Sequence, residues 1–312
     1  MTLQHNFLWQ GRVDSEEQAE DAIRLHQVVE NYTEQSNGIA VIGFCSDEGV
    51  ARNKGRIGAA EAPDLIRQAM ANLPWSGKKA VFDAGNVLCT DGELESAHVN
   101  LASQVSHCLQ QQNFPFVLGG GHEVAYGSWL GLINHLSEKS ATPKVGIINF
   151  DAHFDLRLDT NGCSSGTPFY QIYQDCQQRD IPFHYCCLGV SEIANTQALF
   201  KRADELGVSY LMDTDMPITA LDKVASQLDL FMSNCDALYL TIDLDVLPAN
   251  DAPGVSAPAS RGVGLELLEP LIEQIKASGK LQLADVAEYN PQYDIDGRTA
   301  KVAARLFYQI IK

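Results

Sequence analysis

The stretch NFDAHFD, residues 149–155, places two aspartates and a histidine at alternate positions directly after the apolar run 145–148. Alternate side chains of an extended segment point to the same side. We therefore expect Asp151, His153 and Asp155 to share one site. Carboxylate oxygens and imidazole nitrogens are common ligands of divalent metals. On its own this spacing is a weak signal, because an aspartate after a strand is often only a helix cap.

Other stretches carry the same kinds of side chain after apolar runs. His122 follows three glycines in GGGHEVAYG, Asp243 and Asp245 alternate in LTIDLDVLP, and Glu288 follows a further run in ADVAEYNP. Clustered carboxylates repel one another unless cations neutralise them, and two divalent ions supply enough charge. Oxygen and nitrogen ligands without cysteine favour manganese over zinc, iron, cobalt or nickel. A site with a single ion is the alternative.

Short apolar runs alternate along the chain with longer segments of helical pattern. They predict the strands and helices that must position these residues. Strands that are apolar on both faces, separated by helices, are typical of a parallel sheet covered on both sides, and we predict one α/β domain over residues 1–312. Ligands of such sheets bind beyond the carboxyl ends of the strands, where the polar residues above fall. The loop 156–170 is too long for a plain connection, which indicates a functional loop. The predicted strands are 39–44, 79–85, 114–119, 144–150, 184–190, 236–242 and 281–289, and the predicted helices are 60–73, 92–112, 123–138, 195–206, 217–230, 264–278 and 297–311.

Composition limits the classes of partner that the chain fits. Acidic residues outnumber basic ones by 40 to 22, and the formal net charge of -18 repels nucleic acid. No apolar stretch reaches the ~20 residues of a membrane span, and the N-terminus lacks the basic start and apolar run of a signal peptide. The eight cysteines form no Cys-x-x-Cys pair. We therefore expect a cytoplasmic protein with reduced cysteines that binds a small molecule, as a monomer or a homo-oligomer, and neither nucleic acid nor a membrane.

GGGHEVAYG, NFDAHFD and LTIDLDVLP resemble the three metal-binding signatures of the ureohydrolases, the family of arginases, agmatinases and formiminoglutamases. The resemblance extends from GRIGAAEAPDLIR at 55–67 to AEYNP at 287–291. It implies the arginase fold, a three-layer α/β/α arrangement with a mainly parallel sheet of about eight strands, and two Mn²⁺ per subunit. It also implies three pairs of ligands, one pair for each ion and one pair that bridges both: His122 with Asp155, His153 with Asp245, and Asp151 with Asp243.

The active-site loop departs from that of arginases and agmatinases, which carry a histidine there. The corresponding residue is Ser165, in CSSGTPFY, and no histidine occurs between His153 and His184. RIGAAEAP and APGVSAPASRG also resemble the formiminoglutamases, which hydrolyse a C–N bond of N-formimidoyl-L-glutamate to give L-glutamate and formamide in L-histidine degradation. Two alternatives stay open: another ureohydrolase that acts on a guanidino compound, such as a guanidinobutyrase, agmatinase or arginase, and a non-catalytic metal-binding regulator.

The resemblance and the residues together suggest roles in substrate binding and catalysis. Glu288 matches the family position that pairs with the amidine or guanidine group, and we expect Asp155 to carry a proton to the leaving amine. Arg157 follows Asp155 by two residues, so we expect it, with Ser165, at the mouth of the site. An arginine there offers a bidentate partner to a substrate carboxylate. An arginine that only balances local acidic charge is the alternative, and the weaker candidates for the carboxylate partner are Arg52 and Arg56.

Overall fold

Parallel strands form the centre of the computed structural model, which describes residues 7–18 and 20–312. Part of the N-terminal segment in which we expect no signal peptide, residues 1–6, therefore lies outside the described residues. The sheet runs in the order β1-β3-β2-β4-β9-β8-β5-β6-β7, and each of these neighbouring pairs is parallel. The predicted parallel sheet is thus confirmed, with nine strands in the described residues where about eight were expected. The strands are β1 (Val29–Asn31), β2 (Ile39–Cys45), β3 (Val81–Leu88), β4 (Phe114–Leu118), β5 (Val145–Phe150), β6 (His184–Val190), β7 (Ser209–Met212), β8 (Ala237–Asp243) and β9 (Leu281–Ala287).

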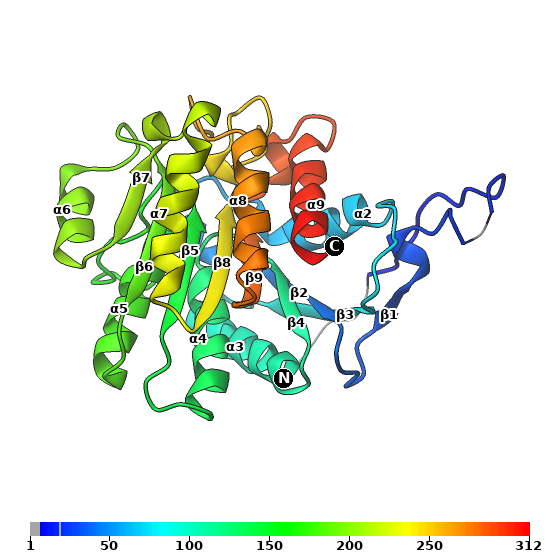
Figure 1. Cartoon of the computed structure of the whole chain (residues 1–312), viewed down its shortest axis with the longest axis horizontal. Helices are drawn as coiled ribbons and strands as arrows, with labels where there is room; N and C mark the ends of the chain where they lie inside the picture. Colours follow the sequence, from blue (N-terminus) through cyan, green and yellow to red (C-terminus); the bar gives the residue numbers. More distant parts are fainter. Residues whose placement is uncertain (1–6, 19) are drawn as a thin grey trace.

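Helices cover both faces of this sheet and give it three layers (Figure 1). Every residue of the central strands β5 and β8 is buried, and successive side chains enter different cores. In β8, Leu240 and Ile242 belong to a core with α2, α7, α8 and α9, whereas Tyr239 belongs to a core with α3, α4, α5 and α6. Strands that are apolar on both faces are therefore explained by a helical layer on each side. The helices are α1 (Glu48–Arg52), α2 (Ala62–Met70), α3 (Leu94–Gln110), α4 (Val124–Ser137), α5 (Pro168–Arg179), α6 (Gln197–Glu205), α7 (Leu221–Ser233), α8 (Leu265–Ala277) and α9 (Arg298–Ile311).

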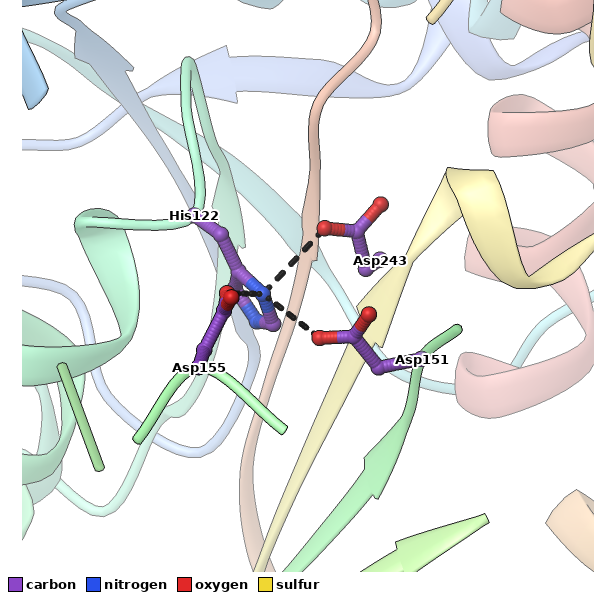
Figure 2. Close-up of side chains that lie close together, drawn as sticks. All are labelled: His122, Asp151, Asp155 and Asp243. Carbon is purple, nitrogen blue, oxygen red and sulfur yellow. Dashed lines mark ion pairs between the residues drawn. The ribbon is translucent and has the colours of Figure 1, made fainter. Parts of the chain in front are cut away.

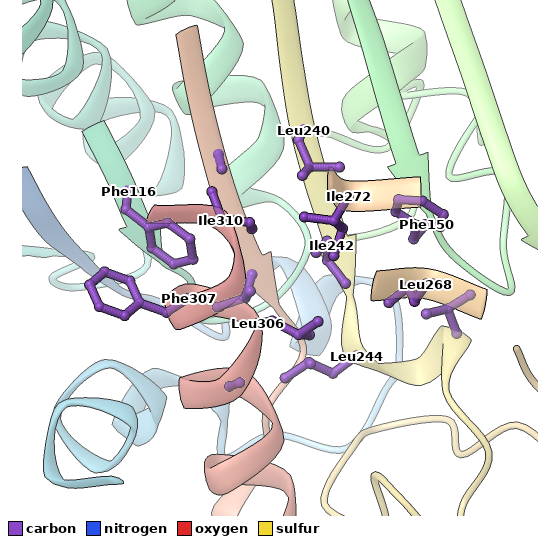
Figure 3. Packing of buried hydrophobic residues seen from close by; sticks show 14 of the residues in the cluster. Phe116, Phe150, Leu240, Ile242, Leu244, Leu268, Ile272, Leu306, Phe307 and Ile310 are labelled. Carbon is purple, nitrogen blue, oxygen red and sulfur yellow. The ribbon is translucent and has the colours of Figure 1, made fainter. Parts of the chain in front are cut away.

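The core on the side of α8 and α9 holds the strands that carry the site (Figure 3). Phe307 of α9 packs edge-on against Phe116 of β4, with ring centroids 4.9 Å apart. Leu268 and Ile272 of α8 lie in the same cluster as Ile242 of β8. Burial of large apolar side chains is worth about 1.5–3 kcal/mol each, so this packing stabilises the strands β4, β9, β8 and β5 that carry the site.

Four elements, two strands and two helices, were not predicted from the sequence. The strands β1 and β7 have only three and four residues and lie at the two edges of the sheet, where strands are often short and weakly patterned. The helix α5 begins at Pro168, inside the predicted loop 156–170, because proline suits the first turn of a helix. Its buried residues Phe169, Ile172 and Cys176 have helical spacing, and this signal was missed. The short helix α1 was also missed.

Two further expectations concern the chain as a whole. No helix in residues 7–18 and 20–312 is long and apolar enough to cross a membrane. The eight cysteines are free, and six of them are buried.

Candidate metal centre

Four neighbouring strands of the sheet deliver the predicted site residues to one edge. In the sheet they stand in the order β4-β9-β8-β5, although they follow one another along the chain as β4, β5, β8 and β9. Because all four run parallel, their carboxyl ends meet. The residues delivered there are His122 after β4, Glu288 after β9, Asp243 and Asp245 at the end of β8, and Asp151, His153 and Asp155 after β5.

One ring nitrogen of His122 faces a carboxylate ring formed by Asp151, Asp155 and Asp243 (Figure 2). Its Nδ1 atom is 3.0 Å from Asp151 Oδ2, 2.9 Å from Asp155 Oδ2 and 3.2 Å from Asp243 Oδ2. The histidine side chain is 1% exposed, so water does not separate these charges. A second histidine has similar neighbours, since His153 Nδ1 lies 3.0 Å from an oxygen of Asp245 and 3.5 Å from one of Asp151.

Asp151 and Asp243 are oriented toward His122 by the same local hydrogen bond. Asp151 Oδ1 accepts a hydrogen bond of 2.6 Å from the backbone N–H of His153, and Asp243 Oδ1 accepts one of 2.8 Å from the backbone N–H of Asp245. Each carboxylate thus closes a turn onto the residue two positions ahead. Its other oxygen, Oδ2, is left to face His122. The turn uses only the backbone N–H two positions ahead, so it orients the aspartate and does not by itself explain the side chain at the second position.

The backbone after β5 differs from the extended segment that the alternating pattern predicted. Ala152 and His153 form a bend, and Asp155 has a φ of 48°, in the left-handed region that is unusual for residues other than glycine. The side chains still converge, but through a turn followed by a left-handed residue. Backbone conformations of this kind cost of order 1–3 kcal/mol and persist where surrounding contacts enforce them, often at functional sites.

The electrostatics of this cluster are those of a site that requires positive charge. Burial lowers the pKa of His122, but the carboxylates of Asp151, Asp155 and Asp243 outweigh it and raise the pKa well above its usual value. Burial and the charges of Asp245 and Asp151 raise the pKa of Asp243 well above its usual value. Burial and the charge of Asp151 likewise raise the pKa of Asp155 to about 6. Divalent cations among these groups would remove the repulsion.

The arrangement of the donor atoms fits metal binding. His122 Nδ1 is buried and makes no hydrogen bond within the described part of the chain, although three carboxylate oxygens lie within 3.2 Å of it. Atoms that are close together without donor–acceptor geometry are typical ligands around a common ion. Two such groups are present, with the ligand atoms of each lying within 4.8 Å of one another. Asp151 belongs to both groups, whereas Asp243 belongs to the first, so its role as a second bridge stays a prediction. The groups are His122, Asp151, Asp155 and Asp243, and Asp151, His153 and Asp245.

Glu288 lies beside the carboxylate ring and belongs to neither group. Its φ is 67°, its side chain is buried, and its Oε1 accepts a hydrogen bond of 2.9 Å from the backbone N–H of His122. Burial, followed by the charge of Glu123, raises the pKa of Glu288 to about 8. A carboxylate in such a place is stabilised by a cationic partner.

A cavity of about 210 Å³ joins the acidic residues to Arg157 and Ser165. Arg157 is exposed and forms no ion pair with any residue that the structure describes. Asn53, which was not predicted, also lines the cavity, and its Nδ2 donates a hydrogen bond of 3.3 Å to Ser165 Oγ. The local pattern around Asn53 carries no signal of this role, because the contact spans 112 positions. The acidic residues that line the cavity are Asp155, Asp243, Asp245 and Glu288.

The side chains of the other two arginines considered for substrate binding are hydrogen-bonded to other groups of the protein. Arg52 pairs with Glu48 and Glu95 and donates to two backbone carbonyls. Arg56 donates to the carbonyl oxygens of Val255 and Ser256, and its guanidinium lies 3.7 Å from the centroid of a tyrosine ring. Of the three arginines, Arg157 is the one whose charge is available to the cavity.

Comparison with known proteins decides the family. Residues 37–312 match the arginase family model. The chain belongs to this family. The formimidoylglutamase of Aeromonas hydrophila subsp. hydrophila is 55% identical over 308 residues, which cover 98% of this chain and 97% of that protein. The formimidoylglutamase of Hahella chejuensis is 53% identical over 307 residues, which cover 98% of this chain and 94% of that protein.

Solved structures of the arginase family have the same fold. A Trypanosoma cruzi formiminoglutamase variant with Mn²⁺ matches with a TM-score of 0.81 and 25% identity, covering 93% of this chain and 97% of that chain. The arginase of Bacillus subtilis matches with a TM-score of 0.75 and 25% identity, covering 88% and 98%. The predicted arginase fold, the hydrolase activity and the resemblance to formiminoglutamases are confirmed. This family member is a metal-dependent hydrolase of a small molecule.

Proposed function

We propose that this arginase family member is a formimidoylglutamase, which hydrolyses N-formimidoyl-L-glutamate to L-glutamate and formamide with two Mn²⁺ per subunit, in L-histidine degradation. The relatives that are 55% and 53% identical over nearly the whole chain carry that name. The observation that carries the proposal for the substrate is the cavity, whose lining combines Glu288 with the free cation of Arg157. N-formimidoyl-L-glutamate has a cationic amidine and two carboxylates. The amidine is complementary to the carboxylate of Glu288, and the carboxylates are complementary to the guanidinium of Arg157.

The site residues would hold the metal ions as the family resemblance implies. In this proposal the ligands would form three pairs, one for each ion and one shared: His122 with Asp155, His153 with Asp245, and Asp151 with Asp243. The membership of Asp151 in both groups of close ligand atoms supports it as a shared ligand. When bound, two divalent ions supply Lewis acidity and lower the pKa of a water molecule. The preference for Mn²⁺ rests on the absence of cysteine among the oxygen and nitrogen ligands.

The remaining residues of the cavity would orient the substrate and move protons. Glu288 would pair with the amidinium group, which places the formimidoyl carbon beside the metal ligands. Water adds to that carbon, the bond from the carbon to the glutamate nitrogen breaks, and the nitrogen takes up a proton. Asp155, which lines the cavity, is the group proposed to carry this proton to the leaving amine. Arg157 and Ser165 would bind the substrate carboxylates.

An assay with several substrates tests this function. The protein is supplied with Mn²⁺ and given N-formimidoyl-L-glutamate, arginine, agmatine and guanidinobutyrate in parallel, and the release of formamide, glutamate and urea is measured. We expect the highest kcat/KM with N-formimidoyl-L-glutamate, with formamide and glutamate released in equal amounts. Faster release of urea from a guanidino compound would assign the chain to another activity of the family. No metal-dependent turnover of any of the four would overturn the enzyme assignment and favour a metal-binding regulator.

A further inference from the structure

A set of buried polar groups lies behind His122, on the side away from the carboxylate ring. The Nε2 atom of His122 lies 3.0 Å from the hydroxyl oxygen of Thr241. Thr241 of β8 stands directly opposite Asp285 of β9 in the parallel register, so their side chains are neighbours. Thr241 and Asp285 are both 0% exposed. Thus His122, Thr241 and Asp285 follow one another from the site into the interior.

Asp285 is a buried carboxylate for which the proposed reaction has no direct use. It belongs to neither ligand group and does not line the cavity. Its Oδ2 accepts a hydrogen bond of 2.5 Å from the hydroxyl of Tyr239, whereas its Oδ1 has no partner among the described residues. Burial of a carboxylate is costly unless its oxygens are hydrogen-bonded. An orphan acceptor beside a threonine hydroxyl therefore indicates where the proton of that hydroxyl points.

The hydrogen bonds can be assigned by following the donors. If the Nε2–H of His122 donates to the oxygen of Thr241, the O–H of Thr241 must find another acceptor. Asp285, which stands beside it in the register, supplies that acceptor. Burial raises the pKa of Asp285, and the neighbouring hydroxyl groups of Thr241, Tyr239 and Ser128 oppose that rise. The opposite tautomer would place a proton on Nδ1, among the oxygens that the metal needs.

We propose that Asp285, acting through Thr241, is a positioning residue that keeps the proton of His122 on Nε2, so that the lone pair of Nδ1 faces the carboxylate ring. This inference rests on the proposed role of His122 as a metal ligand. A metal-bound histidine commonly donates its other N–H to an outer partner, which fixes the ring and strengthens it as a ligand. Loss of such a partner typically weakens metal binding 10–100-fold.

The test is metal affinity. Mn²⁺ binding is measured by calorimetry and by competition with a chelator for the unmodified protein and for Asp285→Asn, Thr241→Val and Thr241→Ser. We expect Asp285→Asn and Thr241→Val to weaken one of the bound ions about 10–100-fold, while Thr241→Ser, which retains the hydroxyl, stays close to the unmodified protein. Tyr239→Phe is the matched control, because it removes a hydrogen bond from the other oxygen of Asp285. The affinity of Tyr239→Phe for Mn²⁺ should change much less than that of Asp285→Asn or Thr241→Val. Unchanged affinity in Thr241→Val would overturn the proposal even if Asp285→Asn does not fold.

A double-mutant cycle separates this positioning role from a general effect on the fold. In a His122→Asn background, Asp285→Asn should cause no further loss of Mn²⁺ affinity, because its effect passes through the histidine. Losses that add in the double mutant would show that Asp285 acts elsewhere, and would overturn the inference. The two proposals fail in different ways. If His122→Asn itself leaves the affinity for Mn²⁺ unchanged, the ligand assignment in the proposed function is wrong; if it weakens binding and Asp285→Asn does not, only the inference about Asp285 is wrong.

Discussion

Glu288 Oε1 accepts a hydrogen bond from the backbone N–H of His122 at 2.9 Å, across 166 positions of the chain. The proposed substrate-binding carboxylate and a proposed metal ligand are therefore fixed relative to each other by one direct contact. The contact exists because β9 lies beside β4 in the sheet. It also means that a change at Glu288 has to be designed so that the hydrogen bond to His122 survives.

We predict that Glu288→Gln keeps the metal ions and loses catalysis. The glutamine oxygen can still accept the hydrogen bond from His122, but the neutral side chain no longer attracts the amidinium group of the substrate. We expect kcat/KM to fall by about 100-fold or more, corresponding to ~2.7 kcal/mol, with Mn²⁺ content unchanged by elemental analysis. Glu288→Ala is the comparison, since it also breaks the contact with His122. A loss of metal from Glu288→Gln with a normal fold would make this residue a ligand.

Asp151 and Asp245 should differ in how many ions they hold. Asp151 belongs to both groups of candidate ligands and Asp245 to one. We therefore expect Asp151→Ala to abolish binding of both Mn²⁺ ions and turnover, and Asp245→Ala to weaken chiefly one ion. Bound metal per chain, measured after gel filtration, is the readout. Two ions retained in Asp151→Ala would contradict its assignment as a bridging residue. A matching loss in Asp243→Ala would support the second bridge.

We expect Arg157 to determine the preference of the enzyme for a substrate that carries carboxylates. Arg157→Ala should lower kcat/KM for N-formimidoyl-L-glutamate by at least ~10-fold, or ~1.4 kcal/mol, because a substrate carboxylate is left without its partner. Arg157→Lys keeps the charge but not the bidentate geometry, so we expect an intermediate loss. An amidine without carboxylates serves as the control substrate and should be affected little. Equal losses with both substrates would mean that Arg157 supports the loop, where its side chain packs against Gly166.

His98 is expected to make stability depend on pH. Burial lowers the pKa of His98 from 6.5 to about 4, so the unfolded chain binds a proton between these values that the folded chain does not. Stability from this source is complete above about pH 6.5 and falls as the pH drops toward 4. Between pH 7 and 5 the loss is on the order of 2 kcal/mol.

Urea unfolding of His98→Gln at pH 7 and pH 5 measures this effect. The variant should lose less free energy of unfolding between the two pH values than the unmodified protein. Phe44→Leu is the matched control, since Phe44 stacks on His98 and does not titrate. It should lower stability by a similar amount at both pH values. An equal pH dependence in His98→Gln and the unmodified protein would show that His98 is not responsible.

Much of this protein could be predicted from the sequence because the information is local. The central strands are apolar on both faces, and seven of them coincide closely with predicted runs because each lies between two helical layers. The candidate metal ligands could be found because each aspartate turn spans only two residues, as in Asp151 with His153 and Asp243 with Asp245. The short edge strands β1 and β7 carry too few residues for a pattern.

Only the tertiary structure decided which distant groups meet. The order β4-β9-β8-β5 places Glu288 against His122 and sets Asp285 behind it, and no local pattern specifies strand order. Contacts made elsewhere in the fold also distinguish the arginines, since Arg52 and Arg56 are bound to other groups of the protein and Arg157 lines the cavity. The physical reason is the same in both cases. Secondary-structure propensity and hydrophobic periodicity act over a few residues. Strand pairing, and the hydrogen bonds that a charged side chain makes, depend on partners that are more than a hundred positions away.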